Sequence, residues 1–299
     1  MPLASLRLTP TPPFNFAETL SSHGWVVLAP NTYHKETNSF SRIEELPGGA
    51  VVHLRVSAEG ENVLIRAESA ATLTAAQKNV IKTRVAHMLR LDDDYSTFYK
   101  LARKKGPPWA ILARRGLGRM FRSPTVWEDA VKTVLTTNIA WGGTKRMAAT
   151  LVNKWGAPSP LDPKQRAFPT PQAIAAVPLK KFEAKAGLGY RGPYLHQLAR
   201  RLSAGELDLQ VWLDPSIPAD DLYRQLLAVK GIGPYAAANL LMLLGRYDRL
   251  GYDTIYRDFV SAKYFSGRVL PLKDMLAVYD DWGEWKFLAY WFEMVMAEE

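Results

Sequence analysis

Two glycines and a proline break a helical pattern near residue 230, and this break constrains the fold more than any other stretch of the chain. Apolar residues recur at helical spacing on both sides of it, with Leu222, Leu226 and Leu227 before and Ala237, Leu240, Leu241 and Leu244 after. Gly231 and Gly233 allow positive φ and close backbone approach, and Pro234 suits the first turn of a helix, where its missing N–H costs nothing. The pattern therefore predicts a helical hairpin over residues 222–244.

The turn of this hairpin is suited to an anion, because the first N–H groups of a helix have no partner within the helix. One interpretation is that the backbone at Gly231 and Gly233 holds a phosphate, with Lys230 beside it. The other is a turn between two helices that only packs, with Lys230 in solvent. Both interpretations fit the turn taken alone.

A carboxylate, Asp253, ends the loop that follows the hairpin. Asp253-Thr254 also has the composition of an N-cap for a helix over residues 255–260. The two roles are compatible, because the N-terminus of a helix favours an ionised carboxylate. Taken alone, the pattern therefore identifies Asp253 as a candidate N-cap with an ionised carboxylate.

The charge of the chain points towards a polyanionic partner. The formal net charge is +9 and the sequence pI is about 9.6, which suits a partner covered in phosphate, although many basic proteins bind no nucleic acid. With 299 residues, of which 47% are hydrophobic, the chain can bury one large core or two moderate ones. We expect two domains.

The sequence contains no cysteine, which excludes disulfides, zinc–thiolate sites and iron–sulfur clusters. We expect no metal site and no cofactor. The first residues do not resemble a signal peptide, and no apolar run of about eighteen residues is long enough to span a membrane. We therefore expect a soluble intracellular protein without a membrane partner. Its expected location is either the bacterial cytoplasm, at the nucleoid, or a nucleus.

The first 70 residues alternate between apolar and polar instead of following a helical period. Runs rich in Val, Ile and Leu occupy residues 24–29, 50–56 and 62–67, and residues 47–49 and 59–61 have turn composition. From residue 74 to 91 the period becomes helical. We expect an α+β fold, with an N-terminal antiparallel sheet domain and its closing helix over residues 1–92 and a mainly helical domain over residues 93–299.

The stretch from residue 100 to residue 122 contains eight basic residues and no acidic one. They are Lys100, Arg103, Lys104, Lys105, Arg114, Arg115, Arg119 and Arg122. A run of this kind either faces phosphate groups or forms a solvated basic surface.

Three motifs together resemble the helix-hairpin-helix DNA glycosylase superfamily. They are the segment 128–156 with Asn138 at a helix end, the stretch 187–191 that resembles a GLGYR motif, and KGIGPY at 230–235 followed by Asp253. The resemblance covers roughly residues 6–296. The alkylpurine and 8-oxoguanine glycosylases also begin with an antiparallel sheet before a helical body, and the lack of cysteine places the chain outside the cluster-bearing branch.

The resemblance implies a role for the hairpin and for the carboxylate after it. In this superfamily the hairpin grips one DNA strand, which assigns Lys230, Gly231 and Gly233 to a phosphate. The aspartate faces the flipped nucleotide, which makes Asp253 the catalytic residue. Such a carboxylate stabilises an oxocarbenium-like sugar or orients the attacking water.

When a nucleotide flips out of the duplex, it leaves a gap in the base stack. The resemblance implies that the other two motifs contact the DNA at this gap. Asn138 contacts the base left behind after flipping, or else only caps its helix. Tyr190 fills the hole and Arg191 hydrogen-bonds the orphaned base, as a flat side chain and a cation on a glycine-flanked loop are able to do. The alternative for Tyr190 is packing on the core.

The base pocket implied by the resemblance consists of Tyr235, Asn239, Tyr252, Phe287 and Trp291. Phe287 replaces the base-reading glutamine of 8-oxoguanine glycosylase and Asn239 replaces its cysteine, whereas Tyr235 stands where alkylpurine glycosylases have a tryptophan. An electron-rich aromatic box suits a cationic alkylated purine through cation–π attraction. The alternative is that these aromatics are ordinary core.

We therefore expect a monofunctional DNA glycosylase that acts as a monomer on double-stranded DNA containing a damaged base. Bifunctional members carry a lysine just after the hairpin turn, and Tyr235 at the matching position cannot form a Schiff base. The expected substrate is an alkylated purine, and 8-oxoguanine or a mismatched pyrimidine is the alternative. A non-catalytic DNA-binding module is the alternative of another class, although a module of that kind needs neither Asp253 nor the GLGYR motif.

Overall fold

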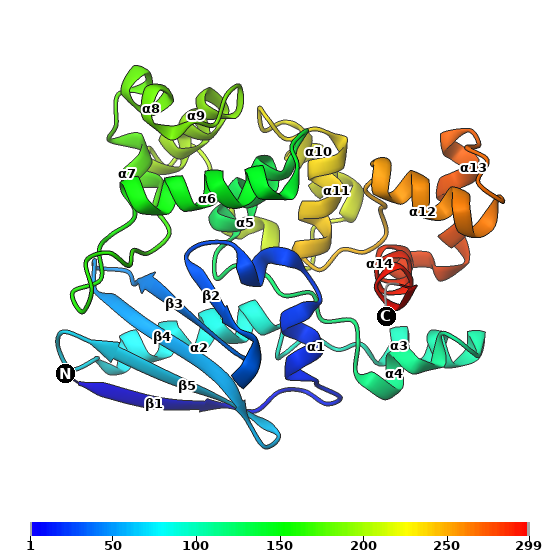
Figure 1. Ribbon diagram of the computed structural model, residues 1–299, viewed down its shortest axis with the longest axis horizontal. Coiled ribbons are helices and arrows are strands. Elements are labelled where there is room, and N and C mark those ends of the chain that lie inside the picture. The colour runs from blue at the N-terminus through cyan, green and yellow to red at the C-terminus, as the bar shows by residue number, and fades with distance from the viewer. Residues whose placement is uncertain (1, 298–299) are drawn as a thin grey trace. The chain divides into compact units, whose positions relative to one another are not determined.

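An antiparallel sheet of five strands forms the N-terminal part of the chain in the computed structural model, which describes residues 2–297 (Figure 1). The strands are β1 (Leu3–Leu8), β2 (Asn31–His34), β3 (Ser39–Glu45), β4 (Val51–Glu59) and β5 (Asn62–Ser69). Their order in the sheet is β1-β5-β4-β3-β2, and every neighbouring pair is antiparallel. The predicted α+β fold, with its N-terminal antiparallel sheet, is confirmed.

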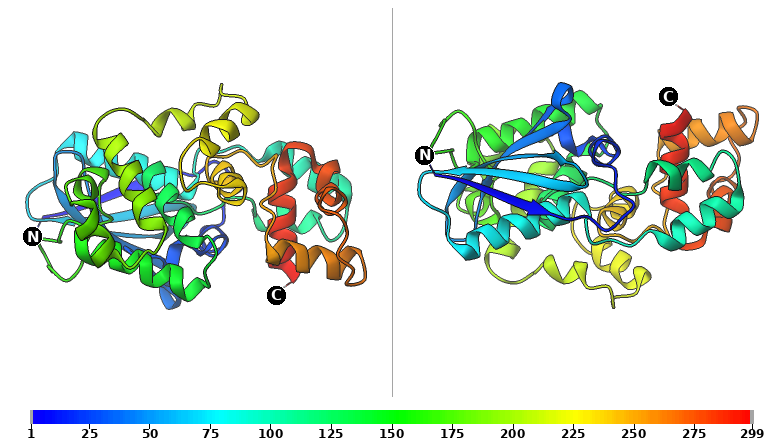
Figure 2. Two further views of the ribbon diagram at one scale, coloured as in Figure 1. Left: turned by 90° about the horizontal axis from the view of Figure 1, so that it is seen from above. Right: turned by 90° about the horizontal axis from the view of Figure 1, so that it is seen from below.

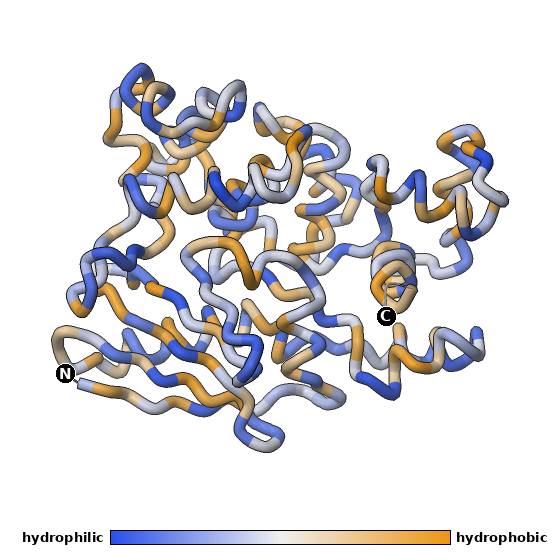
Figure 3. Tube along the Cα trace, viewed as in Figure 1, coloured by the Kyte–Doolittle hydropathy of each residue, from blue (hydrophilic) through white to orange (hydrophobic). Residues whose placement is uncertain are grey.

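Alternation of side chains explains why β4 forms a strand with one buried face. Val52, Leu54 and Val56 are buried, whereas Arg55 between them is exposed. In the view of Figure 3, hydrophobic and hydrophilic residues are interspersed along the strands of the sheet. The predicted turn after β4 is also present, and Gly60 adopts a φ of 59° there, a conformation that glycine accepts without strain.

The strand predicted for residues 24–29 is wrong, because this segment contains a 3₁₀ helix, η1 (Gly24–Val27). Trp25 and Val26 are both buried although they are adjacent, so the side chains do not alternate as a strand requires. The indole Nε1 of Trp25 donates to Asp129 Oδ1 at 2.8 Å. This tertiary contact overrides the β propensity of the run.

The chain divides into two units, and the first comprises Met1–Asp94 and Arg119–Leu209. Its helices are α1 (Phe16–Ser21), α2 (Ala75–Leu89), α5 (Val126–Thr136), α6 (Trp141–Trp155), α7 (Pro171–Ala175), α8 (Leu179–Ala186) and α9 (Arg191–Ser203), with a 3₁₀ turn η2 (Lys35–Thr37). The predicted helix after the sheet is confirmed as α2, which contacts β1 and begins at a capping box between Thr74 and Gln77.

The second unit comprises Tyr95–Gly118 and Gln210–Glu299 and is helical. Its elements are α3 (Ser96–Lys105), α4 (Ala110–Arg115), η3 (Gln210–Leu213), α10 (Ala219–Leu227), α11 (Pro234–Leu243), α12 (Thr254–Tyr264), α13 (Leu272–Leu276), η4 (Ala277–Trp285) and α14 (Lys286–Ala297). Within this unit α12 and α14 lie beside each other (Figure 2). Over residues 2–297, no helix is long and apolar enough to cross a membrane.

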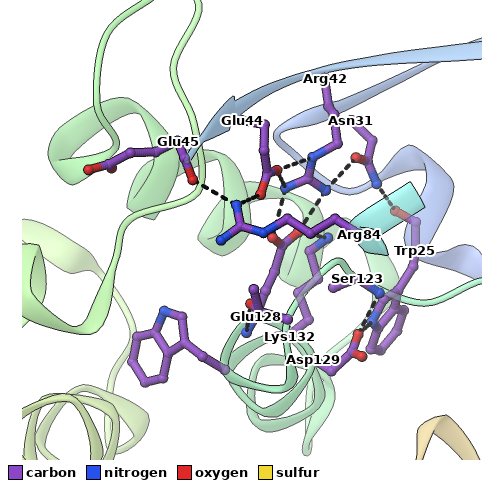
Figure 4. A network of polar contacts seen from close by, with 12 residues as sticks. Trp25, Asn31, Arg42, Glu44, Glu45, Arg84, Ser123, Glu128, Asp129 and Lys132 are labelled. Carbon is purple, nitrogen blue, oxygen red and sulfur yellow. Dashed lines mark hydrogen bonds and ion pairs between the residues drawn. The ribbon is translucent and has the colours of Figure 1, made fainter. Parts of the chain in front are cut away.

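A buried ionic network fixes α5 to the sheet of the first unit (Figure 4). The Arg42 guanidinium of β3 lies 2.9 Å from Glu128 of α5, and Lys132 lies 2.7 Å from the same carboxylate. Burial alone raises the pKa of Glu128, but the charges of Arg42 and Lys132 outweigh it and hold that pKa at about 2. Removing either cation would leave the buried carboxylate of Glu128 with one of its two opposite charges, which is costly in the interior, so the network holds α5 in place.

Candidate nucleic-acid interface and active site

The predicted helical hairpin is present in the second unit as α10 and α11, which pack against each other. Gly231 in the turn has a φ of 96°, which requires glycine, and Pro234 is the first residue of α11. Lys230 and Gly233 are exposed, whereas Ile232 between them is buried and anchors the turn. The N-terminal turn of α11 therefore faces solvent, with a lysine before it.

Asp253 is the N-cap of α12, as the sequence predicted. Its Oδ1 accepts a hydrogen bond from the backbone N–H of Tyr256 at 2.8 Å, and the residue is half-buried. The second oxygen, Oδ2, makes no hydrogen bond with any residue from 2 to 297. The carboxylate thus uses one oxygen to hold the helix, and it lies at the positive end of the helix dipole.

Gly251 lets the loop before Asp253 lie directly against α11. A Cβ at this position would stand 2.9 Å from Asn239 Nδ2 and 3.6 Å from Cδ2 of the Tyr235 ring. Asn239 in turn donates from Nδ2 to the Tyr235 carbonyl oxygen at 2.9 Å. The structure therefore brings Tyr235 and Asn239 together at the loop that leads to the carboxylate.

The remaining predicted pocket aromatics form two pairs. Tyr252 is half-buried, and its ring centroid lies 5.8 Å from that of Tyr256 in α12. In α14 the rings of Phe287 and Trp291 stack at 6.1 Å with an interplanar angle of 16°. Phe287 is 1% exposed, so its ring packs behind the half-buried Trp291 and presents almost no surface to solvent.

A carboxylate that the sequence did not single out, Glu293 of α14, joins α14 to α12. It is buried and accepts hydrogen bonds from Tyr264 of α12 at 2.7 Å and from Tyr279 of η4 at 2.6 Å. Lys263 of α12 completes the cluster at 3.0 Å. Burial and the charge of Glu293 raise the pKa of both tyrosines, which therefore remain protonated donors. The cluster positions α12, whose N-cap is Asp253.

The GLGYR loop of the first unit exposes Tyr190 and joins it to the end of α5. Gly187 and Gly189 both have positive φ, of 63° and 56°, and Tyr190 is 51% exposed. The Tyr190 hydroxyl lies 3.1 Å from Thr137 Oγ1 and accepts a hydrogen bond from Asn138 Nδ2 at 3.3 Å. Packing of Tyr190 on the core is therefore wrong, and the structure brings Asn138 and Tyr190 together at an exposed site.

Arg191 does not lie on the exposed surface that the motif predicted. It is 5% exposed, its guanidinium donates to the Thr137 carbonyl oxygen, and it lies 4.5 Å from the centroid of the Tyr190 ring. These contacts sit beneath the loop, so the side chain supports Tyr190 in this structure. A role in reading an orphaned base requires Arg191 to leave them.

Two members of the basic run between residues 100 and 122 are also buried, so this run does not form one phosphate-facing surface. Arg119 is 2% exposed and donates from Nη2 to the Thr11 carbonyl oxygen at 2.6 Å. Arg122 is 7% exposed and donates from Nε to the His87 carbonyl oxygen at 2.8 Å. The exposed members are Lys100, Arg103, Lys104 and Arg114. In the described part of the chain, no cluster of three or more acidic or histidine side chains is placed to hold a metal ion.

Comparison with known proteins gives no match by sequence and several by structure. No protein-family model and no curated protein matches the sequence. Among solved structures, the 3-methyladenine DNA-glycosylase from Archaeoglobus fulgidus superposes with a TM-score of 0.74 and 18% identity, over 96% of this chain and 96% of that one.

Two further structures match over similar lengths. MBOgg1 in complex with a low affinity DNA ligand has a TM-score of 0.68 and 19% identity, over 99% of this chain and 96% of that one. The apo form of 8-oxoguanine glycosylase/lyase from Clostridium acetobutylicum has a TM-score of 0.68 and 17% identity, over 97% and 95%. At these identities the likeness concerns the fold, and over nearly its full length the chain has the fold of the helix-hairpin-helix DNA glycosylases that its motifs predicted.

Proposed function

We propose that this protein is a base-excision DNA glycosylase, which flips a damaged nucleotide out of duplex DNA and hydrolyses its N-glycosidic bond. The observation that carries the proposal is the carboxylate of Asp253. One of its oxygens caps α12, and the other has no hydrogen-bond partner within residues 2–297. The loop that leads to it packs against Tyr235 and Asn239 at Gly251. Asp253 ends the loop that follows the hairpin, in a chain with the fold of known glycosylases, and this position supports the proposal.

Asp253 supplies the electrostatic part of the reaction. Cleavage of the bond to the base leaves positive charge on the sugar, and an ionised carboxylate fixed by a helix N-terminus stabilises that charge without reorganising. The same carboxylate orients the water that attacks the sugar. Because Oδ1 is committed to the Tyr256 N–H, Oδ2 is the oxygen that faces the reaction.

DNA is held through its backbone and through the gap in its stack. The exposed turn at Lys230, Gly231 and Gly233 binds a phosphate of one strand. The exposed ring of Tyr190 enters the space left by the flipped nucleotide, and Asn138 beside it hydrogen-bonds the remaining base. MBOgg1 was solved with a DNA ligand, and the Clostridium acetobutylicum glycosylase/lyase was also solved with double-stranded DNA, which supports a duplex as the partner.

The proposed enzyme is monofunctional. A glycosylase/lyase needs a lysine amine that attacks the sugar and forms a Schiff base. The position just after the hairpin turn holds Tyr235, and Lys230 stands before the turn, where its side chain is exposed. Water activated by Asp253 is therefore the nucleophile.

The proposed substrate is a purine carrying an added alkyl group. Tyr235, Tyr252 and Trp291 are all half-buried aromatics, and a cationic alkylated base is attracted to electron-rich rings. A cationic base is also a good leaving group, which reduces the need for a general acid. 8-Oxoguanine is the second candidate, because one of the similar structures is an 8-oxoguanine glycosylase/lyase. Phe287 offers no hydrogen bond to the edge of that base, which disfavours it.

A panel of duplexes that each carry one lesion tests the proposal. The protein is incubated with each duplex and the product is heated in alkali, which cuts the strand at an abasic site. We expect cleavage at an alkylated purine that depends on Asp253. Cleavage only at 8-oxoguanine opposite cytosine would reverse the order of substrates, and binding without cleavage of any duplex would identify a non-catalytic DNA-binding module.

A further inference from the structure

A cavity of about 490 Å³ opens in the first unit between α6 and the loop that joins α8 to α9. Met147 and Leu188 contribute apolar surface to it, and no aspartate or glutamate from the described part of the chain lines it. The charged residues between 2 and 297 that line it are all cations, namely Arg146, Lys154, Lys185 and Arg191. Its volume falls within the roughly 300–1,000 Å³ of pockets that bind ligands.

Among residues 2–297, no aspartate or glutamate forms an ion pair or hydrogen bond with Arg191 in this cavity. The residue is 5% exposed, and its hydrogen bonds go to two carbonyl oxygens, those of Thr137 and Leu188. Its Nε–H is buried and has no acceptor within the described residues. A buried cation is costly unless an opposite charge compensates it, and carbonyl dipoles compensate it only in part. The wall of this cavity therefore attracts an anion from outside the protein.

The cations on α6 are spaced for more than one anionic group. Arg146 and Lys154 lie on the same face of the helix, with Thr150 between them, and all three line the cavity. At 1.5 Å per residue, their backbone positions are about 12 Å apart along the helix. Lys185, in the last turn of α8, faces the same cavity. A free phosphate ion reaches one part of this row, whereas consecutive phosphates of a strand reach all of it.

We infer that this cavity binds the phosphodiester backbone of a DNA strand, at a second anchoring point separate from the hairpin turn. The inference rests on the proposed function, because the exposed Tyr190 belongs to the loop that forms one side of the cavity. The backbone phosphates supply the counter-charge that Arg191 lacks. Binding there fixes the loop from below while Tyr190 enters the stack.

Salt dependence of duplex binding tests the site without any need for excision. The triple variant Arg146→Gln, Lys154→Gln and Lys185→Gln is compared with Lys145→Gln, which removes an exposed cation from the same helix but does not line the cavity. Affinity for an undamaged duplex is measured from 50 to about 200 mM salt. The slope of log K against log[salt] should fall by about 0.9 for each phosphate lost, hence by roughly 1 to 2 in the triple variant. The control should lose at most a small part of this.

Inorganic phosphate and neutralised DNA distinguish the sources of the anion. In wild-type protein, single methylphosphonate substitutions along the duplex should reveal one or two positions that weaken binding, and the triple variant should be insensitive at those positions. An unchanged salt slope in the triple variant would overturn the inference. So would binding of inorganic phosphate that the triple variant abolishes while its duplex affinity and slope stay at wild-type values, because the site would then serve a free ion. Failure of the protein to excise any lesion would leave these binding results intact and would count against the proposed function alone.

Discussion

Asp253 has a structural and a chemical role in this account, and a series of substitutions separates them. The cap needs one side-chain acceptor for the Tyr256 N–H, which asparagine and serine also provide, whereas the chemistry needs the negative charge. Asp253→Asn and Asp253→Ser should therefore leave the free energy of unfolding within about 1 kcal/mol of wild type, the scale of the lost charge–dipole interaction. Asp253→Ala should lose about 0.5–2 kcal/mol, because α12 loses its cap.

Excision should not follow this order of stability. All three substitutions remove the charge and should slow single-turnover excision by at least about a hundredfold, which corresponds to about 2.7 kcal/mol of transition-state stabilisation. Urea unfolding and alkaline strand cleavage provide the two measurements. Asp258→Asn is the matched control, since this exposed carboxylate of the same helix pairs with Arg257 at 2.8 Å. Near wild-type excision by the Asn and Ser variants would refute the chemical role and leave Asp253 as a cap only.

The other predictions concern the ring of Tyr190 that enters the DNA stack, the absence of a lysine nucleophile at Tyr235, and the stability of the first unit in acid. Tyr190→Ala should slow excision ten- to a hundredfold, since stacking on a base contributes about 1–3 kcal/mol. Tyr190→Phe keeps the ring and should slow excision less. Equal rates in wild type and both variants would leave Tyr190 with a structural role alone. Borohydride should trap no covalent adduct between wild-type protein and lesion DNA, because Tyr235 cannot form a Schiff base, and a trapped adduct would show that the enzyme is bifunctional. Burial lowers the pKa of His23 to about 3 and that of His87 to about 2, so both side chains are neutral in the folded protein. In the unfolded chain both have the usual histidine pKa of 6.5 and become protonated below that pH. The free energy of unfolding should therefore fall as pH drops below about 6.5, by roughly 1.4 kcal/mol per histidine for each pH unit. Asp129, whose pKa burial raises to about 6, offsets part of this because it gains a proton first in the folded state. An unchanged urea midpoint between pH 7 and 5 would contradict the net fall.

Local sequence pattern was sufficient for the elements that carry the proposed chemistry. The glycines and Pro234 predicted the hairpin, and Asp253-Thr254 predicted the N-cap of α12, because each of these features depends on neighbouring residues along the chain. Alternation likewise predicted β4 and β5. The shape of the loop between hairpin and cap also has a local cause, since Gly251 alone allows its close approach to Asn239.

Contacts between distant residues explain what the pattern missed. A run of adjacent apolar residues at Trp25 looked like a strand, but Asp129, far along the chain, accepts a hydrogen bond from its indole and the segment turns instead. Arg191 was expected on an exposed loop, and Thr137 draws its guanidinium beneath that loop. Arg119 and Arg122 were expected, with the rest of the basic run, either to face phosphate groups or to lie in solvent, and both are buried because their carbonyl partners lie on other segments.

Direct detection of the released base is the measurement that tests the central claim. DNA treated with a methylating agent is incubated with the wild-type protein, and the small-molecule fraction is analysed by mass spectrometry. The account predicts free methylated purine in solution, with an intact strand that carries an abasic site until it is heated in alkali. Tight binding of the same DNA, with no free base released from it or from any single-lesion duplex, would contradict the account.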